Sequence, residues 1–169
     1  MLIVDLGTLA RQHRTRIDVD VPPDDALWKV VPWPLDGPVA VRLEAQYAAT
    51  DVLVRGSVSG AAALSCRRCL EPVHRTFDEE LTLLYKAGLS TEEAELAEVY
   101  ALPARAQTLD LAPAVVEHVL LAVPEFVNCD EACRGLCARC GTNLNQASCD
   151  CVVDEPDPRW ATLRRLGTE

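Results

Sequence analysis

The stretch VAVRLEAQY at positions 39–47 determines the first expectation about the fold. Its larger apolar side chains alternate with polar or small ones, which is the period of a strand that buries one face. A turn is predicted at residues 50–51, and further strands are predicted at 52–61 and 73–83. Because these strands follow one another closely along the chain, we expect them to pair antiparallel.

One main helix is predicted after these strands. Apolar residues recur at helical spacing from 112 to 123, and Asp110 is placed to act as the N-cap. Pro113 falls in the first turn, where its missing N–H costs little, and Pro124 ends the helix. The expected fold class is α+β: an antiparallel sheet or a partly closed barrel with one main helix and a C-terminal cysteine-rich, zinc-held module.

Two other segments have weaker patterns. In residues 2–21 a basic run is followed by acids, which predicts a short strand or a turn of helix and then a loop that ends at Pro22-Pro23. Residues 90–98 are acidic and poor in bulky apolar groups. They predict either an exposed helix or a mobile linker, and the linker is favoured.

The chain is expected to have two domains. Residues 1–125 form the α+β core with a CxxC hairpin knuckle, and residues 126–169 form a cysteine-rich zinc-binding module with a short C-terminal helix. After residue 126 the chain has few large apolar groups, as is typical of a small unit held together by metal. Trp160, Leu163 and Leu166 have the spacing of one or two amphipathic helical turns.

The net charge of −10 restricts the class of partner, because 26 acidic residues stand against 16 basic ones. A protein that coats nucleic acid neutralises phosphates with cations, so whole-chain coating of RNA is disfavoured. Either a small local patch contacts RNA, or the partners are basic proteins. No apolar run approaches the ~20 residues of a membrane span, and the first residues lack the order of a secretory signal. The expected location is therefore the cytoplasm.

The eight cysteines are the strongest functional signal. Cytoplasmic thiols are kept reduced, so disulfides are disfavoured. Two thiolates separated by two residues can both point into one tetrahedral zinc site, and eight thiolates predict two Zn²⁺ ions. The cysteines form four close pairs: Cys66 with Cys69, Cys129 with Cys133, Cys137 with Cys140, and Cys149 with Cys151.

The pairing of these ligands into two sites has two solutions. In the first, Cys137, Cys140, Cys149 and Cys151 form a local site, and the other four cysteines tie the hairpin between strands to the segment after the helix. In the rival solution, Cys66 and Cys69 pair instead with Cys137 and Cys140. In both, four cysteine ligands leave no open coordination position, which predicts a structural metal.

Arginines flank the cysteine pairs at positions 67, 68, 134 and 139. Four thiolates around Zn²⁺ have a net charge of −2, so Arg67, Arg68, Arg134 and Arg139 either only compensate this charge or also contact RNA or a partner. Without metal, the arginines would lower the pKa of nearby thiols and favour redox chemistry. Against this, a thioredoxin-like CxxC opens a helix, whereas this one lies between two strand patterns.

No catalytic motif accompanies the cysteines. The chain has no glycine-rich phosphate loop, no nucleophile elbow and no His-x-x-x-His pair, and its three histidines are scattered. We therefore expect that the protein is not an enzyme and has no small-molecule substrate.

Several separate motifs occur in a defined order: Cys66-Arg-Arg-Cys-Leu-Glu-Pro72, Leu121-Ala-Val-Pro124, the run from Cys133 through Cys137-Ala-Arg-Cys140 to Asn145, and Asp157-Pro-Arg-Trp160. This order, over nearly the whole chain, resembles the YceD family, also called the domain of unknown function 177 family.

The resemblance implies a non-catalytic role in 23S rRNA accumulation and large ribosomal subunit assembly, in bacteria and plant organelles. The expected partner is large-subunit rRNA or a precursor particle, with a basic ribosomal protein as a further candidate. The resemblance supplies no set of RNA-contacting residues. Two other functions stay open: a redox-regulated zinc chaperone, and a zinc-stabilised adaptor for an unrelated complex.

Overall fold

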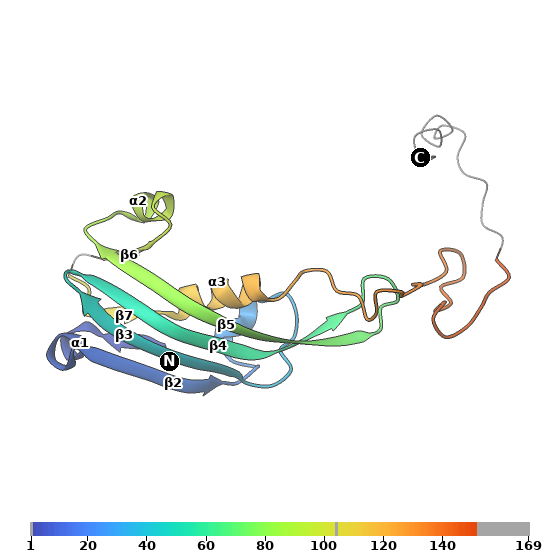
Figure 1. The fold of residues 1–169 in the computed structure, drawn as a ribbon, viewed down its shortest axis with the longest axis horizontal. Coiled ribbons are helices and arrows are strands. Elements are labelled where there is room, and N and C mark those ends of the chain that lie inside the picture. Colours follow the sequence, from blue (N-terminus) through green and yellow to red (C-terminus); the bar gives the residue numbers. More distant parts are fainter. Residues whose placement is uncertain (1, 104, 152–169) are drawn as a thin grey trace, which may run out of the picture.

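The computed structural model describes residues 2–103 and 105–151. Its main feature is a five-stranded sheet in the order β2-β3-β4-β5-β6 (Figure 1). A separate two-stranded sheet pairs β1 with β7. The strands are β1 (Ile3–Asp5), β2 (Arg14–Val21), β3 (Val39–Ala48), β4 (Asp51–Ser65), β5 (Pro72–Ala87), β6 (Tyr100–Leu102) and β7 (Thr108–Asp110).

The pairing confirms the antiparallel sheet predicted from the alternating pattern. β2, β3, β4 and β5 pair antiparallel in sequence order, and only the short β6 is parallel to its neighbour β5. Within the described residues the sheet does not close on itself, so the alternative of a partly closed barrel is wrong. Edge strands of an open sheet keep unpaired backbone groups.

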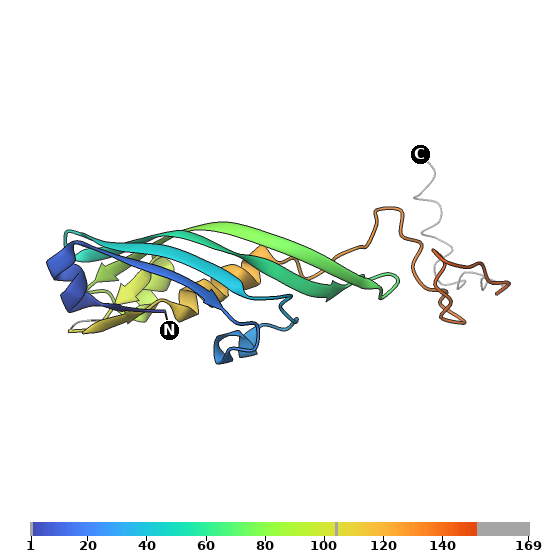
Figure 2. The same cartoon turned by 90° about the horizontal axis from the view of Figure 1, so that it is seen from below.

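One face of the sheet forms the core. Val41, Val58 and Leu81, from three different strands, are nearly or fully buried on this face. Helix α3 (Ala112–Ala122) packs against β5 and covers the same core with Val115 and Val119 (Figure 2). The large apolar side chains of alternating positions thus meet the apolar stripe of the predicted helix, which excludes water from both.

The structure differs from the prediction at the start of the chain, where a loop was expected up to Pro22. Residues 6–12 form helix α1 (Leu6–Gln12), and residues 14–21 form β2. The last two arginines of the basic run, Arg14 and Arg16, and the acids that follow lie at the exposed positions of β2 and form ion pairs with β3. Arg16 pairs with Glu44, and Arg42 pairs with Asp18 and Asp20. Cross-strand pairing of opposite charges explains why a charged segment is a strand.

The favoured linker at residues 90–98 is also wrong, because the structure contains helix α2 (Thr91–Leu96) there. A capping box begins this helix: Glu93 N–H donates to the Ser90 hydroxyl, and the Glu93 carboxylate accepts from the Ser90 N–H. Ala94 is buried beneath it. A capping box satisfies backbone donors that a short helix would otherwise leave unpaired.

Helix α3 begins one residue later than the predicted cap implies. Leu111 is the N-cap and gives no side-chain hydrogen bond, so the prediction that Asp110 is the N-cap is wrong. The Asp110 side chain still accepts a hydrogen bond from the Ala112 N–H at 2.9 Å. Pro113 lies in the first turn as predicted. Among the described residues, no helix has the length and apolarity to span a membrane.

The β4–β5 hairpin is longer than the rest of the sheet and places the cysteines. It pairs in register from Val52 with Tyr85 to Ser65 with Pro72. Its closed end projects beyond the other strands, and the segment that follows α3 runs out to meet it (Figure 1). The hairpin therefore brings Cys66 and Cys69 to the same end of the molecule as the later cysteines.

The short C-terminal helix predicted around Trp160 lies outside the described residues.

Candidate metal centres

The core cysteine cluster consists of Cys66, Cys69, Cys129 and Cys133, whose sulfur atoms all lie within 4.8 Å of one another. The first two cysteines lie in the turn between β4 and β5. The other two follow α3, and the Arg67 N–H donates to the Val127 carbonyl at 2.9 Å to hold the two segments together. Cys129 is exposed, while the three other cysteines of the cluster are buried.

The sulfur distances in the core cluster fit a tetrahedral metal. Cys66 Sγ and Cys133 Sγ are 3.8 Å apart, and Cys69 Sγ and Cys129 Sγ are 3.5 Å apart. Zn–S bonds of about 2.3 Å in a tetrahedron place the sulfurs about 3.8 Å from one another. A disulfide would need about 2.05 Å. The spacing is therefore that of four ligands around a common centre.

The C-terminal cysteine cluster consists of Cys137, Cys140, Cys149 and Cys151, and its sulfurs also lie within 4.8 Å of one another. Cys140 is exposed, and the others are half-buried. The eight cysteines are thus grouped as in the first of the two predicted pairings. The rival pairing of Cys66 with the Cys137 segment is not the one that the structure forms.

Both CxxC segments form the same turn. In the first, the Leu70 N–H donates to the Cys66 carbonyl, and the Cys66 N–H donates to the Glu71 carbonyl, each at 2.9 Å. In the second, Gly141 and Thr142 make the equivalent bonds with Cys137, at 2.9 and 2.8 Å.

The fourth residue after the first cysteine is left-handed in both turns, with φ 62° at Leu70 and 72° at Gly141. This conformation curls the chain so that both thiols of a CxxC point to one side. Glycine adopts it freely, whereas a leucine is held there against its preference.

Several polar residues that the sequence did not single out support the clusters. The Asn145 side chain donates to Cys133 Sγ at 3.3 Å and accepts from the Arg134 N–H at 2.7 Å. The Glu71 carboxylate accepts from the side chains of Asn143 and Gln146 at 3.1 and 2.9 Å, which joins the β4–β5 turn to the C-terminal segment. Hydrogen bonds of this kind orient the residues that bind a metal directly and stabilise the negative charge of the thiolates. The run Asn143-Leu-Asn145 after a CxxC was the available signal.

Within each cluster, the surroundings lower the pKa of some thiols and raise the pKa of others. The Cys69 backbone N–H is the main cause that lowers the pKa of Cys66 to about 6. Hydrogen bonding with the neighbouring thiols of Cys69 and Cys133 raises the pKa of Cys129 to about 12. In the C-terminal cluster, the Thr142 side chain chiefly lowers the pKa of Cys140 to about 6.

The difference between lowered and raised thiol pKa values within one cluster follows from charge repulsion. Four close thiols cannot all ionise together, so some give up their protons and the others donate hydrogen bonds to the resulting thiolates. A divalent cation removes this conflict, because it pairs with all four thiolates at once. The donor set of each cluster therefore fits Zn²⁺.

The four predicted contact arginines are all exposed, but they differ in position and in hydrogen bonding. Arg68 donates from Nη1 to the Cys133 carbonyl at 2.9 Å, so its side chain holds the two halves of the core cluster together. Arg67 is exposed in the same turn, and Arg134 is exposed beside Cys133. Arg139 lies in the second CxxC turn, and is exposed too. The first three arginines therefore gather around the core cluster, and the fourth belongs to the C-terminal cluster.

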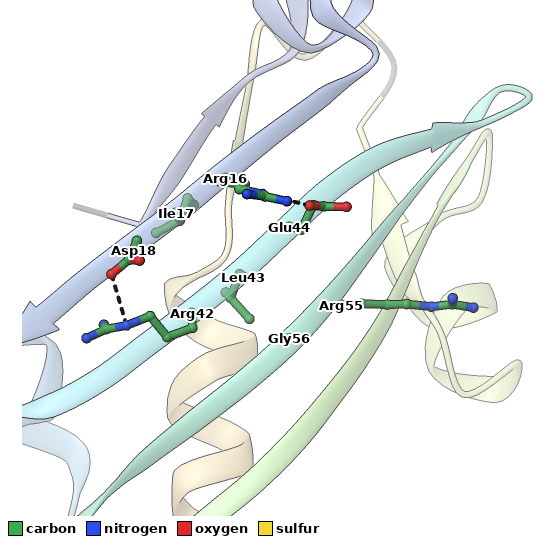
Figure 3. A pocket seen from close by; sticks show the side chains of 8 residues that line it. All are labelled: Arg16, Ile17, Asp18, Arg42, Leu43, Glu44, Arg55 and Gly56. Atoms are coloured by element: carbon green, nitrogen blue, oxygen red, sulfur yellow. Dashed lines mark hydrogen bonds and ion pairs between the residues drawn. The ribbon is translucent and has the colours of Figure 1, made fainter.

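A second charged surface lies on the outer face of the sheet, away from the cysteines. It is a shallow hollow of about 220 Å³ over β2, β3 and β4 (Figure 3). The Arg42–Asp18 and Arg16–Glu44 pairs cross it, both at 2.9 Å, while Arg55 points away from them. Its charges are largely neutralised by one another, and they are exposed. The hollow therefore has no group whose surroundings favour acid–base or nucleophilic chemistry.

Comparison with known proteins gives a family match over the part of the chain that contains the cysteines. The family described as "Large ribosomal RNA subunit accumulation protein YceD" matches residues 54–167, which include all eight cysteines and more than half of the chain. This chain belongs to the YceD family. The match begins in β4, so it contains most of the β4–β5 hairpin, all of α3 and both cysteine clusters of this YceD-family chain.

Relatives are found in bacteria and in a plant. An uncharacterized protein of Mycobacterium leprae is 31% identical over 79% of this chain and 60% of its own length. An uncharacterized protein of Mycobacterium tuberculosis is 34% identical over 70% of this chain and 57% of its own length. The chain thus spans somewhat less than two thirds of these relatives.

The large ribosomal RNA subunit accumulation protein YCED homolog 1, chloroplastic, of Arabidopsis thaliana is 34% identical over 38% of this chain and 20% of its own length. No solved structure matches the chain.

Proposed function

We propose that this YceD-family protein is a non-enzymatic, cytoplasmic zinc-binding factor that supports 23S rRNA accumulation and assembly of the large ribosomal subunit. The observation that supports it best is the grouping of eight cysteines into two four-thiol clusters within the part of the chain that matches the family. The names of the family and of the plant relative both refer to accumulation of large-subunit rRNA.

Each cluster would bind one Zn²⁺ with a structural role. The core cluster would join the β4–β5 turn to the segment after α3, and the C-terminal cluster would order residues 137–151. Four thiolates fill the coordination sphere of zinc, so neither site has a position for water or substrate. Zinc would cross-link segments that have few large apolar side chains of their own and so cannot form a core.

The candidate RNA or partner contacts are Arg67, Arg134 and Arg139, with Arg68 in a supporting position. Metal binding would place these arginines at one end of a chain whose net charge is −10. Exposed arginines in the cysteine turns would allow local contact with rRNA phosphates without coating by the whole chain. A precursor particle is the matching partner, because it presents both rRNA and basic ribosomal proteins.

Depletion of the protein in its host tests the proposal. We expect the ratio of large- to small-subunit rRNA to fall and the large-subunit peak of a sucrose gradient to shrink. Re-expression of the natural chain should restore both, and the Cys66→Ser/Cys69→Ser variant, produced at a matched level, should not. An unchanged ratio and profile after depletion would contradict the assembly role and favour the zinc-stabilised adaptor.

A redox-regulated zinc chaperone is the second candidate, and the exposure of Cys140 favours it. An exposed thiolate is more accessible to oxidants than a buried one. Under the assembly proposal, mild peroxide should leave both zinc ions in place, because four-thiolate ligation shields sulfur. Rapid zinc release coupled to suppression of client aggregation would favour the chaperone instead.

A further inference from the structure

Among the described residues, no strand pairs with the outer edge of β5 over most of its length. β6 pairs only with Tyr85, Lys86 and Ala87, at the end far from the cysteine clusters (Figure 1). For residues 73–84, the only backbone pairing to another described segment is that with β4. Alternate N–H and C=O groups of such a strand point away from the sheet and can pair with another chain.

Exposed apolar side chains lie beside the start of this edge and on the helix that packs against β5. Phe126 is 64% exposed, and Leu121, at the end of α3, is 76% exposed. A hollow of about 440 Å³ lies between β5 and the segment after α3, lined by Arg75 of β5 and by Phe126, Asp130 and Glu131. Exposed aromatic and aliphatic groups next to an open strand give an incoming strand somewhere to bury its own side chains.

The surroundings of the edge are acidic. Asp78, Glu79 and Glu80 follow one another on β5 and are exposed on both faces of the strand. Glu125, Asp130 and Glu131 lie on the neighbouring segment and are exposed as well. Together these acidic residues outnumber the two arginines beside them, Arg75 of β5 and Arg68, whose Nη1 lies 3.5 Å from the Glu131 carbonyl. Carboxylates in this number repel RNA phosphates and attract lysine and arginine side chains.

We propose that the edge formed by residues 73–84 of β5 binds an extended, lysine- or arginine-rich segment of a protein partner, which adds to the sheet as a strand. Backbone hydrogen bonds to β5 give the affinity, and the acidic run and Phe126 select the side chains. The inference rests on the proposed function and deepens it by naming the class of protein partner. It assigns two adjoining surfaces: the arginines in the cysteine turns would face rRNA, and the β5 edge would face protein.

A second copy of this chain is a poor occupant of the same edge. Two β5 strands paired antiparallel about Glu79 would place the acidic runs of both copies against each other. Like charges directly opposite one another destabilise a strand pair. The charge of the edge therefore favours a different, basic chain.

The test uses the full-length, zinc-loaded chain and a fluorescent peptide of alternating lysine and valine, as long as the open edge. Binding is followed by anisotropy, and amide hydrogen exchange locates the contact. The edge variant is Asp78→Lys/Glu80→Lys. The matched control is Glu92→Lys/Glu95→Lys on α2, which changes the net charge by the same amount at exposed positions away from the β5 edge. A peptide with glutamate in place of lysine controls for sequence.

We expect the lysine peptide to bind the natural chain and to slow exchange in residues 73–84. The edge variant should bind at least about tenfold more weakly, and the α2 variant should bind like the natural chain. Equal weakening in both variants, binding of the glutamate peptide, or no protection in residues 73–84 would overturn the proposal. Self-association of the chain that competes with the peptide would do the same.

The C-terminal residues of this chain are the remaining occupant, because they include Arg164 and Arg165. If the natural chain fails to bind the peptide and the full-length Arg164→Glu/Arg165→Glu variant binds it, the edge is occupied from within and the proposal of a partner is wrong. The assay contains neither RNA nor ribosomes, so a negative result leaves the outcome of the depletion experiment unchanged. Conversely, an unchanged rRNA ratio after depletion would contradict the assembly role but would not account for a failure of the purified chain to bind the peptide.

Discussion

The Arg68 guanidinium donates a hydrogen bond to the Cys133 carbonyl at 2.9 Å, between residues that are 65 positions apart in the sequence. The bond links the turn of the β4–β5 hairpin to the segment after α3, next to the sulfur atoms of the core cluster. Its neighbour Arg67 is also exposed, and its bond to another described residue comes from the backbone N–H, which donates to the Val127 carbonyl. Two adjacent arginines therefore have separable roles.

Arg68→Gln should lower the stability of the zinc-loaded chain by about 1 kcal/mol, because a carbonyl beside the cluster loses a charged donor. Arg67→Gln should leave stability within about 0.5 kcal/mol, as is usual for exposed positions. It should weaken rRNA association and flatten its salt dependence. Chemical denaturation and salt-dependent RNA binding measure the two effects. Equal loss of stability in both variants would contradict the division of roles.

Cys137→Ser/Cys140→Ser should remove only the C-terminal metal site. We expect zinc content to fall from two ions to one, with faster amide exchange in residues 137–151 and unchanged exchange in β3 and β4. Cys66→Ser/Cys69→Ser is the matched variant, and it should instead free the segment around Cys129. Native mass spectrometry counts the metal ions. Loss of the strand core in the first variant would show that the two clusters do not behave as separate sites.

Glycine should be the favoured residue at the left-handed position of both turns, so removing it at 141 and introducing it at 70 should have opposite effects on stability. Gly141→Ala should destabilise the C-terminal cluster by about 1 kcal/mol, since alanine is strained at φ 72° although its Cβ would meet no atom within 4 Å. Leu70→Gly should relieve strain at an exposed position and, after the entropy cost of glycine, stabilise the core cluster by roughly 0.5 kcal/mol. Zinc affinity measured by chelator competition reports both. The same sign in both variants would show that φ at this position is not what matters.

The stability that the capping box gives to helix α2 should depend on pH. Hydrogen bonds from the Ser90 backbone N–H and then from its hydroxyl lower the pKa of Glu93. The folded value lies below the unfolded one, so the contribution is complete above the ordinary glutamate pKa of about 4.3 and is lost as pH falls through the lower, folded value. Exchange of the Thr91–Leu96 amides should quicken in that acidic range. Glu93→Gln should remove the dependence, whereas Glu92→Gln should keep it.

Sequence periodicity predicted the central sheet because it reports burial directly. Residues 39–47 alternate between core and solvent in the structure as they do in polarity, and β4 and β5 follow with the predicted antiparallel order. The same reasoning failed for β2, whose half-buried face, including Ile17 and Val19, is too weakly apolar to outweigh its charged positions. Those charges are satisfied only by Arg42 and Glu44 of β3, which a reading of local sequence does not include.

The sequence by itself determined that the cysteines form close pairs suited to a four-thiolate metal site, because two-residue spacing and turn chemistry act within a few residues. The tertiary structure decided which pairs share a centre, since Cys66 meets Cys133 only where a long hairpin reaches the segment after α3. It also decided that Arg68 holds the cluster and that the β5 edge stays open in the described chain. These outcomes depend on distances between segments that are remote in sequence, and such distances follow from packing of the whole sheet and helix.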